Sequence, residues 1–434
     1  MHSSAIASGI IKKTTLALVL IFVYLLGIHL RLSIYGTGGN AVVPLYLCLL
    51  SGAVLSVMFR REVFRSLKHL LLFGAFLLFV PFLNLLLVPG ALTVQSYKSS
   101  ALFLASILLS LALIVALRRI PGYRLRRMIF FIWLLIVLLG VLEILFLHSV
   151  FEGISESIYT SSGRGIYTSL DRDVSLYGQI RAKVLASEPS FLAFTLLSLC
   201  SIYYVSAHSE NIPGTNLRMG FMLFATYAIC PSMTIVFFLI ALSAWRFWPK
   251  KRRNIVLLLC SIVLALIAVQ AFNLVFPFLG ASLATLAGDH GSTGSFFGRI
   301  TVGPIAAFRI LSQFPIFGVG IGNSDIAGPE IQKIWTESGA FIQFPWYEEL
   351  SFNATNLMSN GFWWQWIYLG LLGTPIFILF TTNILRSIGV LYPFRAIFCA
   401  WIIWYSGGGF VDPISWFLVA IFSTSPHHPL STNR

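Results

Sequence analysis

The sequence is poor in charge. Only 10% of its 434 residues are Asp, Glu, Lys or Arg, whereas a soluble domain typically carries roughly 25%. At the same time 57% of the residues are hydrophobic. This combination excludes an ordinary soluble enzyme and a disordered protein, and it leaves an integral membrane protein.

Cysteine is also scarce. The five cysteines, at 48, 200, 230, 260 and 399, lie in or beside apolar runs and form no C-x-x-C pair. We therefore interpret them as small residues facing the core or the lipid, not as disulfides or metal ligands. The metalloprotease motif H-E-x-x-H is absent as well, and we expect chemistry that uses neither a metal ion nor another cofactor.

Long apolar runs are abundant. A helical span needs about 20 apolar residues, and the runs lack the polar–apolar alternation of a membrane β-barrel. We predict an all-α fold, a polytopic transmembrane helix bundle of about twelve spans that forms a single integral membrane domain over residues 1–434. The expected spans are 14–30, 41–59, 69–88, 99–117, 128–148, 190–206, 219–230, 233–248, 255–276, 361–380, 396–411 and 413–425.

The net charge of +14 follows from orientation in the membrane. With both termini in the cytoplasm, twenty of the 29 basic residues fall on the cytoplasmic side, together with only two acids, Glu62 and Glu210. The external segments hold the other nine basic residues and twelve acids, and Glu143 lies within the fifth span. This is the positive-inside rule, so the basic excess indicates a lipid bilayer and no nucleic acid as partner.

Two external loops, 149–189 and 277–360, are far longer than the cytoplasmic loops. A membrane protein with its polar mass on one face usually works on that face. A transporter built from two matched halves would show an internal repeat, and none is visible.

A third feature is the segment Cys230–Met233, where Pro231 predicts a hinge between two short helices, next to a cavity.

Three charged residues stand at the end of the first long loop. One interpretation is structural: Glu188 and Pro189 start the next helix, because proline fits the first turn and an acid suits the helix dipole. The other is functional: Arg181 and Lys183 face a cavity at the membrane edge and bind a phosphate, while Glu188 accepts a proton. The sequence leaves both interpretations open.

The second long loop contains a glycine-rich turn. Gly318, Gly320 and Gly322, followed by Asn323, could let backbone N–H groups approach a phosphate. The alternative is a tight turn between two amphipathic helices. A dinucleotide site is disfavoured because no strand precedes the turn.

The stretch 299–313 precedes this turn and has the spacing of an amphipathic, interfacial helix. Its expected apolar face comprises Ile300, Pro304, Ala307, Phe308 and Leu311. A cation is unfavourable at a helix N-terminus, so Arg299 at the start of this helix indicates anion binding.

Simple ion pairs remain an alternative for both arginines. Arg181 could pair with Asp171 or Asp173. Arg299 could pair with Asp289.

Three segments, in this order, resemble the O-antigen polymerase and ligase family of bacterial envelopes. The stretch 181–193 has an arginine followed by a Pro–small–Phe–Leu–Ala helix start, and 299–323 joins an arginine, an amphipathic helix and a glycine turn ending in asparagine. The stretch 359–373 has an asparagine followed by Gly-x-x-Gly. Ser359 replaces the histidine implicated in catalysis in the ligases, and this favours a polymerase.

The resemblance implies a metal-independent membrane glycosyltransferase of the bacterial inner membrane. It would polymerise oligosaccharide repeat units, carried on undecaprenyl pyrophosphate, into O-antigen or a related surface polysaccharide on the periplasmic face. The expected partners are the lipid-linked oligosaccharide, a chain-length regulator and a flippase. The alternatives are an O-antigen ligase and a polysaccharide-precursor transporter or flippase.

The same resemblance suggests roles for individual residues. Arg181 and Arg299 would bind the pyrophosphate, since arginine stabilises phosphate charge strongly in a low-dielectric site. Glu188 is the first candidate for the base that takes the hydroxyl proton, His290 the second and Glu348 a weaker third. The candidate substrate-binding residues are Lys183, Gly318, Gly320, Gly322, Asn323 and Asn360.

Overall fold

The computed structural model describes residues 2–31, 45–88, 93–160, 173, 180–248, 294, 297–349, 351, 354–408, 410–411 and 413–424. Across these residues the chain is all-helical, without strands. Among the described residues, six helices are long and apolar enough to cross a membrane. They are Lys13–Leu30, Arg60–Asn84, Ser96–Arg119, Gly122–Tyr159, Pro189–Ser209 and Gly361–Ser387. The all-helical fold is confirmed and its long apolar helices fit a membrane protein, while the count of about twelve spans and the external loops stay predictions.

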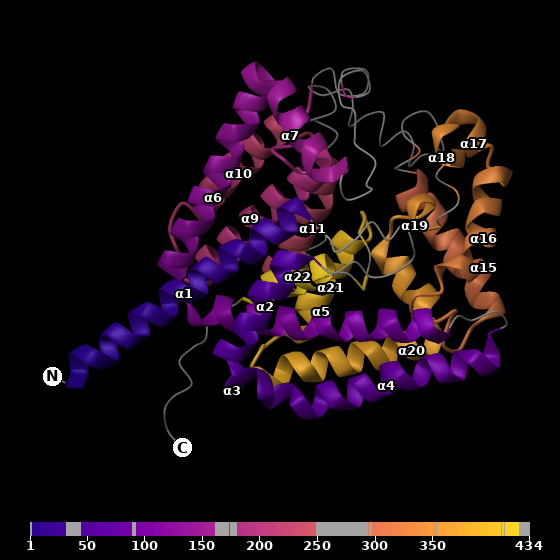
Figure 1. The fold of residues 1–434 in the computed structure, drawn as a ribbon, viewed down its shortest axis with the longest axis horizontal. Helices are drawn as coiled ribbons and strands as arrows, with labels where there is room; N and C mark the ends of the chain where they lie inside the picture. Colours follow the sequence, from indigo (N-terminus) through magenta and orange to yellow (C-terminus); the bar gives the residue numbers. More distant parts are fainter. Residues whose placement is uncertain are drawn as a thin grey trace.

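Helices occupy eleven of the twelve expected ranges, and the remaining range, 255–276, lies outside the described residues. The first part of the chain forms α1 (His2–Leu30), α2 (Tyr46–Met58), α3 (Arg60–Val63), α4 (Leu67–Leu87) and α5 (Thr93–Arg119). Helices α4 and α5 pack along each other in the lower part of Figure 1. The apolar runs therefore locate the helices well.

The fifth expected span is longer than predicted. Helix α6 (Gly122–Leu142) continues through a π-helical turn, η2 (Glu143–Leu147), into α7 (His148–Thr160). The first long loop, expected from residue 149, thus begins as a helical extension of the span. Single π-turns within α-helices occur frequently at functional sites.

The predicted hinge at Cys230–Met233 is confirmed. After α9 (Pro189–Ser209), two short helices follow, α10 (Thr215–Ile229) and α11 (Thr234–Arg246), separated at this hinge. The Ile229 carbonyl at the end of α10 accepts a hydrogen bond from the backbone N–H of Ala182, 3.1 Å away. The first long loop therefore binds the backbone at the hinge.

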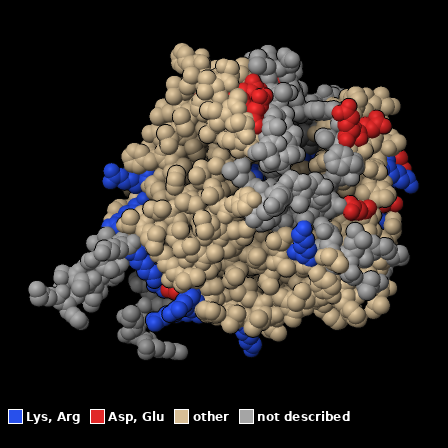
Figure 2. Space-filling model, in the orientation of Figure 1, with Lys and Arg blue, Asp and Glu red and all other residues tan. Residues whose placement is uncertain are grey.

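The second long loop forms a separate group of helices, seen on the right of Figure 1. It begins with the π-helical turn η3 (Phe297–Thr301). It continues as α15 (Val302–Gln313), α16 (Ser324–Glu337), α17 (Ala340–Gln343), α18 (Trp346–Glu349) and α19 (Ala354–Leu357). This group faces α7, and most of the visible Asp and Glu side chains in Figure 2 lie around α7 and this group.

Helix α15 confirms the predicted helix and shows which of its residues pack against the protein. Its buried residues are Val302, Gly303, Ala306, Ala307 and Ile310. Phe308, on the expected apolar face, is 80% exposed, which is compatible with an interfacial helix whose apolar face meets lipid. Lipid is as apolar as a protein core, so apolar spacing alone does not identify the packed face of a helix that meets the membrane. Small residues identify the packed face of α15 instead. Gly303 lies so close to α20 (Gly361–Ser387) that a Cβ on it would be 2.4 Å from the Trp363 ring.

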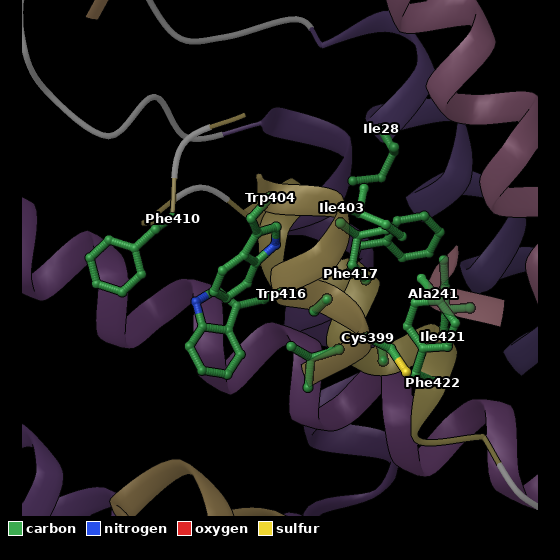
Figure 3. Packing of buried hydrophobic residues seen from close by; sticks show 14 of the residues in the cluster. Ile28, Ala241, Cys399, Ile403, Trp404, Phe410, Trp416, Phe417, Ile421 and Phe422 are labelled. Atoms are coloured by element: carbon green, nitrogen blue, oxygen red, sulfur yellow. The ribbon is translucent and has the colours of Figure 1, made fainter. Parts of the chain in front are cut away.

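The last segment forms α20 (Gly361–Ser387), α21 (Pro393–Trp404) and α22 (Pro413–Phe422). Helix α20 is broken at Gly370, whose φ of 70° and ψ of −173° are not helical. Below the break, aromatic rings fill the core. Phe103 packs on Phe410 (ring centroids 4.9 Å apart), Trp416 (5.7 Å) and Phe377 (6.0 Å), and Figure 3 shows Phe410 and Trp416 of this cluster.

Candidate functional site

Arg299 lies in η3, within the second long loop. Its backbone carbonyl accepts a hydrogen bond from the Asn360 side chain, with Nδ2 and O 2.5 Å apart. The neighbouring Gly298 packs closely, since a Cβ there would lie 2.5 Å from the Leu357 carbonyl oxygen. Arg299 is thus held by its backbone, and its side chain is not needed for anchoring.

The Arg299 guanidinium is half-buried. Its Nε is buried, and within the described part of the chain no atom forms a hydrogen bond with it. No described carboxylate lies within ion-pair distance of it either. Asp289, the partner considered from the sequence, and His290, the second candidate base, are outside the described residues. A half-buried cation of this kind is a favourable place for an anionic group.

Arg309, one helix length away, provides the contrast. Its guanidinium lies 2.7 Å from Glu337 and 4.0 Å from Glu330 across to α16. The hydrogen bond from Arg309 lowers the pKa of the Glu337 carboxyl. This exposed network stabilises the α15–α16 pair weakly, and it leaves Arg309 neutralised.

Asn360, predicted to bind substrate, joins three segments of the chain, and substrate binding by it stays a prediction. Its Nδ2 donates to the carbonyls of Arg299 and Tyr405, and its Oδ1 accepts from the Trp363 N–H at 3.1 Å, as the N-cap of α20. Both amide hydrogens are therefore used within the protein. This positioning role has a sequence signal, an asparagine directly before an apolar helix, but the partners lie 61 and 45 residues away in the chain.

Asn360→Asp is expected to impair the site more than Asn360→Ala. The carboxylate keeps the N-cap acceptor but faces two carbonyl oxygens at hydrogen-bond distance, and buried groups of like polarity repel. Polymer yield at matched protein level, followed on gels of cell-envelope polysaccharide, measures the difference. Equal activity of wild type and both variants would contradict a positioning role.

The glycine-rich turn fills the break in α20. The N–H groups of Val319 and Gly320 donate to the carbonyls of Ile367 (2.9 Å) and Tyr368 (3.1 Å). In return, the N–H of Leu371 donates to Pro315 at 2.8 Å. The turn thus satisfies the backbone groups that the break leaves open.

Each glycine of this turn has a positive φ: 61° at Gly318, 85° at Gly320 and 88° at Gly322. A Cβ on Gly318 would lie 2.1 Å from the Ile367 oxygen. Asn323 is buried, and its Nδ2 donates to the Val319 carbonyl. Packing explains Gly318, Gly320 and Asn323, and phosphate binding at this turn stays a prediction.

Arg181, at the end of the first long loop, forms a buried ion pair with Asp173. Two of its nitrogens, Nε and Nη2, lie 3.1 and 2.8 Å from the same Asp173 oxygen. The ion-pair alternative for Arg181 is thus present. Asp173 also completes a D-x-D sequence with Asp171, but Asp171 lies outside the described residues.

Lys183 is buried, with 1% of its surface exposed. Its Nζ lies 3.7 Å from a carboxylate oxygen of Glu152 on α7, and the other oxygen of Glu152 lies 3.6 Å from the His148 ring. Glu152 was not singled out from the sequence. The i, i+4 spacing of His148 and Glu152 on an extended helix was the available signal.

Glu188 has the structural role considered for it. It occupies the N-cap position of α9, with Pro189 in the first turn, and its carboxylate accepts a hydrogen bond from the Ser190 hydroxyl at 2.9 Å. It is only partly buried, so it remains accessible to a ligand. Glu348, the weaker candidate base, is exposed on α18.

The two long loops are connected through α11. Ala182, next to Arg181, binds the hinge that precedes α11. Further along α11, the Phe237 ring stacks on Tyr405 with centroids 6.3 Å apart, and the Tyr405 carbonyl accepts from Asn360, which holds Arg299. The end of α10 and the first turn of α11 thus contact the supports of the two arginines.

No group of three or more His, Cys, Asp or Glu side chains that could hold a metal ion occurs among the residues that the structure describes. No protein-family model, curated protein or solved structure matches the chain.

Proposed function

We propose that this protein is a glycosyltransferase of the bacterial inner membrane that polymerises undecaprenyl-pyrophosphate-linked repeat units on the periplasmic face. The observation that carries the proposal is the Arg299 guanidinium, half-buried and without a described carboxylate partner, in the segment that resembles the O-antigen polymerase and ligase family. A polyprenyl pyrophosphate brings an anionic leaving group to the periplasmic surface of this membrane, where such a cation is useful.

The chemistry is one glycosyl transfer. The bond between the anomeric carbon of the growing chain and its pyrophosphate oxygen breaks, and the pyrophosphate keeps the electron pair. A hydroxyl oxygen of the next unit forms the new glycosidic bond and gives its proton to a base. Arg299 stabilises the charge that develops on the leaving pyrophosphate.

The first loop would supply the acceptor side of the site. Glu188 is our candidate base, since its carboxylate is partly exposed and contacts only a neutral hydroxyl among the described residues. Arg181 is already paired with Asp173, so we assign it a supporting role in binding the phosphates. A chain-length regulator and a flippase remain the expected protein partners.

Deletion of the gene separates the candidate functions. A polymerase predicts surface lipopolysaccharide that carries at most one repeat unit, visible as a loss of the ladder on a silver-stained gel. A ligase predicts the loss of all attached polymer, with long lipid-linked chains retained in the membrane. A flippase predicts lipid-linked units accumulating on the cytoplasmic face. Either of the last two results would contradict the proposal.

A further inference from the structure

Residues 181–187, which we name the arch, form a buried turn in an unfavourable conformation. Val184 and Leu185 have φ angles of 45° and 67°. A positive φ is rare for any residue with a side chain, and at a β-branched residue such as valine it is a true outlier. Such backbone strain persists only where the surrounding structure enforces it, and it clusters at functional sites.

The Glu143 carboxylate enforces this conformation through hydrogen bonds that it accepts from the arch. It is fully buried at the start of the π-turn η2. One oxygen accepts from the N–H groups of Lys183 (3.0 Å) and Val184 (2.6 Å), and the other lies 3.1 Å from the Lys183 nitrogen. A carboxylate is thus placed directly under the strained residue, although Glu143 and Lys183 are 40 positions apart in the sequence.

Three further contacts hold the other side of the arch. The His29 ring lies 2.7 Å from the Val184 carbonyl oxygen, through Nε2. The Tyr159 hydroxyl lies 2.9 Å from the Leu185 carbonyl oxygen. Gly140, one turn before Glu143, lets the arch approach α6, since a Cβ there would lie 3.3 Å from the Ala182 side chain.

We propose that Glu143 is a positioning residue, which fixes the arch and thereby the backbone that carries Arg181 and Lys183, whose side chains pair with Asp173 and Glu152. The inference rests on the proposed function for what the two cations bind. The geometry of the arch is independent of the proposed function, because the hydrogen bonds and the backbone strain belong to the protein itself. Glu143 acts through its acceptor oxygens and takes no proton from substrate.

Two substitutions separate positioning from acid–base chemistry. Glu143→Gln keeps an acceptor oxygen for the arch N–H groups, whereas Glu143→Ala removes it. We expect Glu143→Ala to lower polymer formation at least ten-fold, and Glu143→Gln to stay within a few-fold of wild type. Equal loss in both variants, with the arch intact, would overturn the positioning role, and so would full activity of Glu143→Ala.

A second-site variant tests the link to strain. Glycine adopts a positive φ without cost, so Val184→Gly should restore part of the activity in the Glu143→Ala background. The same change in the wild-type background should have little effect. If Val184→Gly gives no rescue, Glu143 does not act by enforcing this backbone conformation.

The state of the arch is also measurable without activity. Ser187 is 6% exposed, and Ser187→Cys is nearly isosteric. In intact membranes, a water-soluble maleimide should leave the introduced thiol unlabelled in the wild-type and Glu143→Gln backgrounds, and should label it in the Glu143→Ala background. Labelling that is unchanged by Glu143→Ala overturns the inference. The expected labelling with no polymerase activity in any variant would instead reject the proposed function and leave the arch role standing.

Discussion

Arg299→Ala is expected to lower polymer formation by about 100- to 1000-fold, the loss typical of removing one preorganised donor from a developing oxyanion. The guanidinium has no described carboxylate to neutralise it, and its backbone is fixed independently by Asn360. The variant should therefore fold normally and lose only charge stabilisation. Arg299→Lys should recover a small part of the activity, since an ammonium lacks the bidentate fork.

Arg309→Ala is the matched control. It removes an arginine from the same segment, but one whose charge is already balanced by Glu337 at 2.7 Å and Glu330 at 4.0 Å. We expect near-normal polymer, because an exposed ion pair contributes little to stability. Comparable losses in the two variants, at equal protein level, would show that Arg299 has no special role.

Gly318→Ala is expected to destabilise the protein by about 3 kcal/mol, through strain at a positive φ and a forced backbone shift. The new Cβ would lie 2.1 Å from the Ile367 carbonyl oxygen, at the point where the turn fills the break in α20. The carbonyl is backbone and has no alternative rotamer. Thermal unfolding of the detergent-purified protein measures the effect as a lower apparent Tm.

Gly220→Ala provides the control for this prediction. Gly220 lies in α10, and a Cβ there would meet nothing within 4 Å. Alanine favours a helix over glycine by about 1 kcal/mol, so this variant should unfold at the same or a slightly higher temperature. If Gly318→Ala were as stable as Gly220→Ala, the turn could not be packed into the break as described.

The sequence predicts the helices well because apolar runs are a local property. The hinge at Cys230–Met233 follows from one proline, and the helix start at Glu188–Pro189 follows from residues that cap a helix locally. The ion pair between Arg181 and Asp173 could be considered from the sequence for the same reason, because the two residues are only eight positions apart in the chain.

The supports of the site could not be predicted in this way, because they are long-range. Asn360 reaches Arg299 and Tyr405, and Glu143 reaches the arch, over tens of residues. The packing of the glycine turn into the break at Gly370 is likewise recognisable only in three dimensions. Long-range polar contacts of this kind leave no periodic signal in a single sequence.

The central claim is tested most directly in proteoliposomes that contain the purified protein and the lipid-linked repeat units extracted from the deletion strain. We expect wild-type protein to join two or more units and to release undecaprenyl pyrophosphate in equal amount to the bonds formed. We also expect Arg299→Ala to abolish both products while Arg309→Ala retains them. Lipid-linked units that stay monomeric with wild-type protein, or polymer that forms equally well with Arg299→Ala, would contradict the central claim.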